Sequence, residues 1–499
     1  MSLKSIIIIG ILLRVMLFIF FSPWNDMVRD NSLIISDARQ YNNVAINLME
    51  GVYSCDDPNS DKIYVDNYRV PLFPVILRQI YECIGYYPVI YLLLQIVMQC
   101  FAIAIIYYTA LLIGCSLGGA TFGAMIMAFH PDLIVSSMQF LPDTLFMLCL
   151  CGFLYYFYNF IIKDNEWSLV LAGICLGLSV LAKPISIFLP ILAVAMIIIH
   201  FVVKYGYKNI SIIADKLFSA FTFFVLAFLI VIQGWVLSNY EEFGRFGISS
   251  QTGPSAINFM ASKILSNQQN IPNEISRGKM MSMLKEKYEL SPDFEIELKN
   301  KGMYTPTYPI YTLDKYRMSE EYWNRETNTI NNISEYSKAQ SIVSFYFIKN
   351  NLSRYAEMSA IGYVQTLAVP QFQEAFRMVF PTTDFDVFIK SRSFDRAREI
   401  GYNVFVYSIF ICIIMISING IVMITAGYGT FMAKNKMIAI FNVLIIVYFL
   451  VLIGPAGNSR YKVLILPPIA LLASNVIRKK NKTLVAYSTT DCDMYNIQI

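Results

Sequence analysis

Long apolar runs recur along this chain, separated by short polar turns and by two long polar segments. Apolar runs of about 20 residues are typical of helices that cross a membrane. We therefore predict an all-α polytopic membrane protein with about ten transmembrane helices. The predicted spans are residues 5–22, 89–113, 117–135, 142–162, 167–182, 184–203, 217–237, 403–427, 437–454 and 461–477.

The two long polar segments, 23–88 and 238–402, divide the series of spans. Neither contains a run long enough to cross a membrane, although 355–369 is apolar enough to lie against one. This pattern predicts four regions along the chain. They are an N-terminal transmembrane catalytic module at 1–237 with the first outer loop at 23–88, a large outer loop domain at 238–402, C-terminal transmembrane helices at 403–477 and a basic cytoplasmic tail at 478–499.

Positive charges in the short connections indicate how the chain is oriented, because Lys and Arg favour the cytoplasmic side of a membrane. With the N-terminus in the cytoplasm, the short outer connections hold only Lys183 and Arg460. The cytoplasmic side then holds Lys4, Lys163, Lys204, Lys208, Lys216, Lys434, Lys436 and the basic tail. Both long segments are therefore expected outside, which is the periplasm if the membrane is a bacterial inner membrane.

The stretch 36–51 in the first long segment is polar, yet it has helical spacing. Its apolar stripe consists of Ala38, Tyr41, Ala45, Leu48 and Val52. Ser36 is placed to cap the helix, and Gly51 is placed to end it. The pattern predicts an amphipathic helix along the membrane surface, with Asp37 in its first turn.

Composition supports the membrane class and excludes others. Of 499 residues, 56% are hydrophobic and 15% are charged, whereas soluble proteins have about 25% charged residues. The net charge of +4 gives no indication of nucleic-acid binding. His130 and His200 are the only histidines, which excludes a His-rich metal site. A divalent metal held by carboxylates stays open, and no other cofactor is indicated.

Ionisable residues gather at the predicted outer face, next to apolar spans. They are Asp37, Arg69, Asp132, Asp143, Lys183 and Arg460. Charges in such places are costly and often mark function, although each one alone also fits a solvated loop end. Arg14 lies inside the first span, where an arginine costs about 2.5–3.5 kcal/mol at the bilayer centre. We expect an acid near the outer face as its partner.

Short motifs follow one another along the chain in a set order. They are the helix pattern Asp37, Tyr41, Ala45, Leu48, Gly51; then Tyr68-Arg69-Val70-Pro71-Leu72; Pro142-Asp143-Thr144-Leu145-Phe146; Leu181-Ala182-Lys183-Pro184; Gln233 to Tyr240; and Ser459-Arg460-Tyr461-Lys462. In this order and spacing, residues 1 to about 475 resemble the GT-C glycosyltransferases of the protein O-mannosyltransferase and aminoarabinose-transferase type.

The resemblance implies that a sugar is moved from a polyprenyl-phosphate carrier to a hydroxyl, usually with inversion. The attacking hydroxyl must lose a proton to a carboxylate, and the resemblance gives this role to Asp37. Arg69 and Arg460 match basic positions suited to the leaving lipid phosphate. Lys183 is a third cation for the phosphate or, alternatively, an anchor at the membrane interface.

Other residues match the family with less specific roles. Asp143 matches an acidic position, where it could act on the acceptor, hold a divalent metal or pair with Arg14. Tyr41, Asn239 and Tyr461 are candidates for acceptor or supporting contacts. The family motif Pro-Trp-x-x-Arg-Asn-Tyr after the seventh span is changed here, because Gly234 and Ser238 replace its Pro and Arg.

Two alternatives stay open. An O-antigen polymerase or ligase has about as many spans and a large outer loop, but it would not need the Asp37 helix. A transporter or flippase would show an internal repeat and paired intramembrane charges, whereas the sequence shows only Arg14 and no repeat. The expected partners are a polyprenyl-phosphate-sugar donor, a glycan, lipid or protein acceptor and the lipid bilayer, with no nucleic acid.

Overall fold

The computed structural model describes residues 1–288, 290–300, 330, 332–371, 374, 375, 378 and 402–477. Within these residues the protein is built from helices, and the only β feature is an isolated bridge between Leu290 and Ile330. The predicted all-α fold is confirmed for this part of the chain. The predicted basic tail at 478–499 lies outside the described residues.

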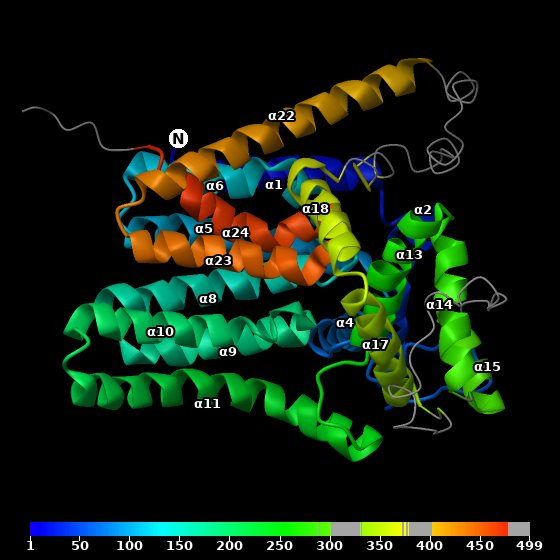
Figure 1. The fold of residues 1–499 in the computed structure, drawn as a ribbon. Coiled ribbons are helices and arrows are strands. Elements are labelled where there is room, and N and C mark those ends of the chain that lie inside the picture. Colours follow the sequence, from blue (N-terminus) through cyan, green and yellow to red (C-terminus); the bar gives the residue numbers. More distant parts are fainter. Residues whose placement is uncertain are drawn as a thin grey trace, which may run out of the picture.

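Long apolar helices run side by side and form a bundle (Figure 1). In the described part, seven helices are long and apolar enough to cross a membrane, two of them with a short 3₁₀ turn attached. They are α1 Leu3–Phe21, α5 Val89–Leu112, α8 Asp143–Lys163, η2 Pro184–Ser186 with α10 Leu189–Tyr205, α11 Ile210–Phe243, α22 Tyr402–Met432, and α23 Lys436–Ile453 with η6 Gly454–Ala456.

The count of ten spans is not confirmed, because three predicted spans form shorter helices: α6 Leu117–Phe129, α9 Glu166–Ala182 and α24 Lys462–Ala473. The run 117–135 is broken at His130, and α7 Pro131–Ser136 follows it. Proline cannot continue a helix but fits the first turn of the next one. The 12 residues of α24 rise about 18 Å, less than the roughly 30 Å of a hydrocarbon core.

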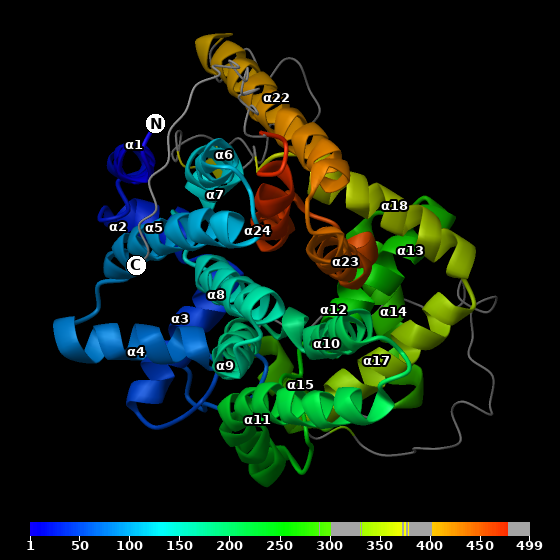
Figure 2. The ribbon, with the colours of Figure 1, turned by 90° about the vertical axis from the view of Figure 1, so that its left-hand side faces the viewer.

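Helix α24 is enclosed in the bundle, and all of its residues are buried. A helix that is apolar all round belongs in such a place. It lies among α6, α8, α22 and α23, as the end view shows (Figure 2). The backbones approach closely, because a Cβ on Gly119 would lie 2.1 Å from the Ser474 oxygen and a Cβ on Gly429 would lie 2.0 Å from the Leu472 oxygen. Small residues permit such packing between membrane helices.

The helices of both long segments gather at one end of the bundle, which we call the loop end (Figure 1). The N-terminus of α1 lies at the opposite end. A second hydrophobic core joins helices of residues 256–348, apart from the core of the bundle. The loop-end helices are α2 Asp26–Val28, η1 Arg29–Leu33, α3 Asp37–Met49, α4 Leu72–Ile84, α12 Thr252–Ser255, η3 Ala256–Ala261, α13 Ser262–Gln269, α14 Asn273–Lys287, α15 Pro292–Asn300, α17 Ile333–Lys349 and α18 Leu352–Ala368.

Helix α3 is the predicted amphipathic helix, with two corrections. Gly51 follows it at a φ of +83°, as the predicted end requires. Ser36 stands at the start, but its φ is +50° and its side chain makes no capping hydrogen bond, so the predicted cap is wrong. The apolar stripe packs largely on protein, because Ala38, Tyr41 and Ala45 are buried while Leu48 and Val52 are partly exposed. The Tyr41 ring, for example, packs on Phe73 of α4 at a centroid distance of 5.0 Å.

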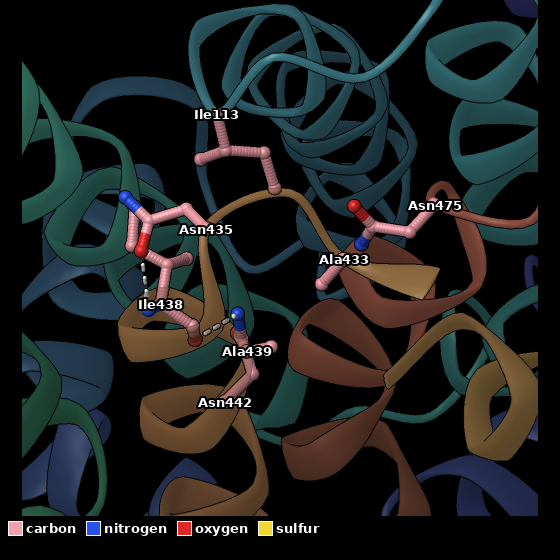
Figure 3. A pocket seen from close by; sticks show the side chains of 7 residues that line it. All are labelled: Ile113, Ala433, Asn435, Ile438, Ala439, Asn442 and Asn475. Carbon is pink, nitrogen blue, oxygen red and sulfur yellow. Dashed lines mark hydrogen bonds between the residues drawn. The ribbon is translucent and has the colours of Figure 1, made fainter. Parts of the chain in front are cut away.

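A small cavity of about 10 Å³ lies far from the loop end, at the turn between α22 and α23 (Figure 3). Such a volume suffices for about one water molecule. Its lining includes three amides, of which Asn435 caps α23 at Ile438 N (3.1 Å) and Asn442 donates to the Ile438 oxygen (3.0 Å). Asn475 faces them across the cavity. We regard the cavity as part of the packing between helices.

Candidate active site

Five charged residues, all predicted from the sequence, meet at the loop end in one network. Arg69 Nη2 donates to Asp37 Oδ1 at 2.6 Å. Arg460 bridges two acids, because Nη1 donates to Asp37 Oδ2 at 3.0 Å and Nε donates to Asp143 Oδ2 at 3.0 Å. Lys183 Nζ donates to the other oxygen of Asp143. We call these five residues the charged network.

The fold brings the network together because four of its members stand at or beside helix ends, whereas Arg69 lies in the loop that precedes α4. Asp37 and Asp143 open α3 and α8, where a helix dipole favours an acid. Lys183 directly follows α9, and Arg460 lies in η7 Ser459–Tyr461, just before α24. These helix ends share the loop end, so residues up to 423 positions apart come into contact.

Arg69 is the most enclosed cation of the network, with a side chain only 3% exposed. The side-chain oxygen of Gln40 accepts from its Nε at 2.9 Å and from its Nη2 at 2.6 Å. Its guanidinium lies 4.7 Å from the centre of the Tyr41 ring and 5.0 Å from that of Tyr68. Aromatic faces attract cations at such distances, so this arginine is held in place before any ligand arrives.

Asp37 differs from its neighbours because its side chain is 39% exposed, whereas that of Asp143 is 2% exposed. A ligand can therefore reach Asp37. Arg69, together with Arg460, holds the pKa of the Asp37 carboxyl well below its usual range. This carboxylate is thus ionised at neutral pH and, in this arrangement, is a weak base.

The cations of the network outnumber its acids by one. Burial has the largest effect on Arg69 and disfavours its charged form, but Asp37 and the ionisable neighbours Tyr41, Tyr68 and Cys55 together outweigh it and raise the pKa of Arg69. Burial lowers the pKa of Lys183, and Asp143 opposes that effect. Three cations face two carboxylates, so the network carries one positive charge in excess at neutral pH.

The other predicted site residues fall into two groups. Tyr41 and Tyr461 belong to the site, because Tyr41 lies under Arg69 and the Tyr461 ring centre is 5.0 Å from Lys183 Nζ. Asn239 does not contact the network. It is buried, and its amide donates to the Gly247 oxygen at 2.8 Å, which holds the turn after α11.

Asp132, the sixth ionisable residue of the predicted outer face, lies outside the charged network. It forms a fully buried ion pair with Lys462 at 2.9 Å. One of its oxygens also accepts from the backbone N–H of Gln371 at 2.7 Å. This acid therefore joins chain segments behind the network and does not face a ligand.

The expected acid partner of Arg14 is wrong. Arg14 Nε donates to Gln99 Oε1 at 2.5 Å, and Nη1 donates to the backbone oxygens of Gly10 at 2.9 Å and Ala128 at 2.8 Å. Three helices thus satisfy the guanidinium with neutral oxygens, and Asp143 faces Arg460 and Lys183 instead. The buried charge serves helix packing between α1, α5 and α6.

Sequence reasoning missed three contributors to the site. Gln40 could have been found, because it lies three positions after Asp37 and so shares its side of the helix. Tyr68 stood in the motif beside Arg69 and contacts it. Lys462 stood in the motif with Arg460, but its pairing with Asp132, 330 positions away, could not be seen in the sequence.

The carboxylates of the network do not fit a divalent metal in this arrangement. Each oxygen of Asp37 and Asp143 already accepts from a cationic side chain. The part of the chain that the structure describes contains no group of three or more His, Cys, Asp or Glu residues able to hold a metal ion.

Comparison with known proteins shows which family part of the chain is similar to. Residues 69–235 match the family model of dolichyl-phosphate-mannose-protein mannosyltransferase. That segment contains Arg69, Asp143 and Lys183. The resemblance to GT-C glycosyltransferases is confirmed. The match covers less than half of the chain, and no curated protein sequence matches it.

Solved structures of GT-C glycosyltransferases resemble the chain distantly. The S. cerevisiae protein O-mannosyltransferase Pmt1-Pmt2 complex bound to the sugar donor is 16% identical at a TM-score of 0.37, over 52% of this chain and 36% of that chain. ArnT from Cupriavidus metallidurans bound to undecaprenyl phosphate is 12% identical at a TM-score of 0.39, over 93% of this chain and 77% of that chain. The apo state of the same ArnT is 11% identical at a TM-score of 0.35, over 93% of this chain and 76% of that chain.

Proposed function

We propose that this protein is an integral-membrane glycosyltransferase that moves a sugar from a polyprenyl-phosphate carrier to a hydroxyl of a cell-envelope acceptor, with inversion. The observation that carries the proposal is the charged network, in which five residues chosen from sequence motifs are joined by one chain of hydrogen bonds. We propose that this site faces the outside of the membrane, which is the periplasm if the membrane is a bacterial inner membrane, and the distribution of Lys and Arg supports this orientation.

The donor phosphate matches the electrostatics of the network. A sugar phosphodiester carries one negative charge, and the network has one positive charge in excess. Arg69 and Arg460 each present a planar fork that suits phosphate oxygens. When the bond to the sugar breaks, negative charge grows on the lipid phosphate, and cations placed beforehand stabilise it. Lys183 adds a third cation on the side of Asp143.

Donor binding would also prepare Asp37 for its role as general base. Arg69 and Arg460 now hold its pKa low, and a base with a low pKa accepts a proton poorly. A bound phosphate competes for both guanidinium groups. As they turn toward it, the pKa of Asp37 rises and the carboxylate is freed to accept the proton of the attacking hydroxyl. Asp37 is thus proposed to act only once the donor is in place.

Asp143 has a different proposed role, because it is buried and holds two cations at once. It orients Arg460 and Lys183 toward the phosphate. Its contacts favour this role over holding a metal or the acceptor, so we propose a reaction that needs no divalent metal. The network cations supply the positive charge that a metal would otherwise provide.

A cleft of about 650 Å³ between α13, α18 and η6 is the proposed entry for the acceptor. Five of its eleven lining residues carry an amide or a hydroxyl, among them Asn267, Asn270 and Gln365. Pro455, which also lines the cleft, is five positions before Arg460. Amides and hydroxyls hydrogen-bond to hydroxyl-bearing acceptors. Replacing Asn267 and Asn270 together by Ala is expected to raise the acceptor KM and leave the donor KM unchanged.

The decisive experiment uses the full chain in sealed lipid vesicles with a labelled polyprenyl-phosphate sugar and membrane glycans as acceptor. The proposal expects release of free polyprenyl phosphate and transfer of the label, both abolished by Arg460→Ala. A flippase would move the donor across a vesicle membrane without cleaving it. Intact donor and labelled lipid on the other side would therefore refute the transferase.

A further inference from the structure

Arg460, the bridge between the two acids, lies on a short turn of residues 457–462 that has no long helix of its own. Asn458 Oδ1 accepts from the Arg460 backbone N–H at 3.0 Å, which shapes η7 locally. Local bonds alone do not fix where the whole turn sits. Both ends of the turn are instead held by one segment from the loop domain.

The first end is held by a crossing of glycines. Gly362 of α18 packs directly against η6, where a Cβ on Gly362 would lie 2.2 Å from the Gly454 oxygen. A Cβ on Gly457 would in turn lie 2.1 Å from the Gly362 oxygen. Both clashes are with backbone atoms, so neither can be relieved by moving a side chain. The start of the turn is therefore set by the position of α18.

The second end is held by a buried ion pair. Lys462 Nζ donates to the Val369 oxygen at 3.0 Å and lies 2.9 Å from Asp132 Oδ2. Asp132 also accepts from Gln371 N at 2.7 Å. Lys462 and Asp132 are fully buried, where screening is weak and the geometry is well defined. Residues 369–371 thus fix the end of the turn next to Arg460.

The same segment also contacts Gln139, which precedes Asp143 in the chain. The side-chain oxygen of Gln371 accepts from Gln139 Nε2 at 2.9 Å, four positions before Asp143. The Gln139 backbone oxygen accepts from Gln95 of α5 at 2.7 Å. Residues 362–371 of the loop domain therefore contact both the turn that carries Arg460 and the segment that precedes Asp143.

We propose that residues 362–371 form a positioning frame that sets the place of Arg460 in the charged network. Its residues act through Arg460 and do not touch the substrate. The inference rests on the proposed function for its kinetic consequence, since Arg460 is there assigned to the donor phosphate. It implies that the loop domain is needed for donor binding, although none of the five network residues belongs to it.

The primary test is Gly362→Ala, with Gly420→Ala as the matched control. Both glycines lie in helices, but nothing lies within 4 Å of a Cβ on Gly420. Displacing a catalytic group by about 1 Å can cost on the order of 100-fold. We expect Gly362→Ala to lower kcat/KM for the donor by about 10- to 100-fold and the control to match the wild type. Equal activity of the two variants would overturn the proposal.

A double variant separates positioning from general damage. If Gly362 acts through Arg460, then Gly362→Ala combined with Arg460→Ala should be no worse than Arg460→Ala alone. Additive losses would mean that Gly362 acts elsewhere, and the frame would be refuted. Lys462→Met with Asp132→Asn provides a second arm if Gly362→Ala does not fold. It keeps an acceptor for Gln371 N but removes the bond to Val369, and the same non-additivity is expected.

Binding of undecaprenyl phosphate to the full chain in nanodiscs distinguishes failure of the frame from failure of the proposed function. This measurement needs no turnover. If Gly362→Ala weakens binding, and the double variant with Arg460→Ala binds no more weakly than Arg460→Ala alone, the frame is supported even if no sugar transfer is found. Unchanged affinity in Gly362→Ala, where Arg460→Ala weakens binding, overturns the frame and leaves the proposed function standing.

Discussion

Replacing Asp37 by Asn separates chemistry from binding in the charged network. The side chain keeps nearly the same size, but its charge is lost and one oxygen becomes an NH₂ group. In the wild type both oxygens accept from guanidinium groups, at 2.6 Å from Arg69 and 3.0 Å from Arg460. In the variant, one of the two guanidinium groups therefore faces the NH₂ group of the asparagine, which is itself a donor. The excess positive charge of the network also rises from one to two.

These changes predict opposite effects on turnover and on donor binding. Loss of a general base lowers kcat by about 10²- to 10⁴-fold, which corresponds to about 2.7–5.5 kcal/mol in the activation free energy. Donor binding should be retained or strengthened, because the phosphate meets more positive charge and no longer competes with a carboxylate for the two arginines. We therefore expect a large fall in kcat without a rise in the donor KM.

Initial rates at varied donor concentration, measured as released polyprenyl phosphate, test this expectation. Asp57→Asn is the matched control, because Asp57 is an exposed acid of the same loop whose turn bond to Asn59 an asparagine can also accept. Should Asp37→Asn raise the donor KM and leave kcat unchanged, Asp37 would be a binding support and its role as base would be refuted. Loss of the folded protein on size-exclusion chromatography would indicate a structural role.

Three further predictions follow from the contacts. Arg69→Lys should lower donor affinity about tenfold in a binding assay, because an ammonium cannot reproduce the planar fork shared by Asp37 and Gln40. The stability that Asp37 contributes should be fully present above its unfolded pKa of about 3.9 and lost as the pH falls toward its lower folded pKa. The difference in thermal unfolding temperature between the wild type and Asp37→Asn should therefore be constant from pH 8 to about 5 and shrink as the pH falls below about 4. Arg14→Leu should destabilise by about 1–3 kcal/mol for each buried oxygen left unsatisfied, such as that of Gln99, while kcat of the folded fraction stays unchanged.

The sequence predicted much of the site because charge and topology are strong signals. Alternating spans place every second connection on the same side, so Asp37, Asp143 and Arg460 had to share one face. That argument gives the side of the membrane but no distances. The bridge from Arg460 to both acids depends on where η7 sits, and this is decided by packing against α18.

Other predictions failed because their cause is not visible in the order of residues. Arg14 was expected to require an acid, but neutral oxygens from two neighbouring helices satisfy it, and backbone oxygens leave no trace in a sequence. Asn239 matched a motif, and the structure shows it holding a nearby turn; its predicted role as an acceptor or supporting contact stays a prediction. The prediction of one span at 117–135 failed for a different reason: it rested on the length of a largely apolar run, although Pro131 in the sequence marks the break.

The enclosure of the cations affects how the protein would respond to ionic strength. Mobile ions weaken the attraction between exposed charges over a Debye length of about 8 Å at physiological salt. They reach buried charges poorly, and the side chains of the cations Arg69 and Lys183 are only 3% and 13% exposed. A basic patch on the protein surface would release an anionic headgroup as salt rises. This network should retain it, so that an enzyme facing a medium of varying salinity would keep its lipid carrier.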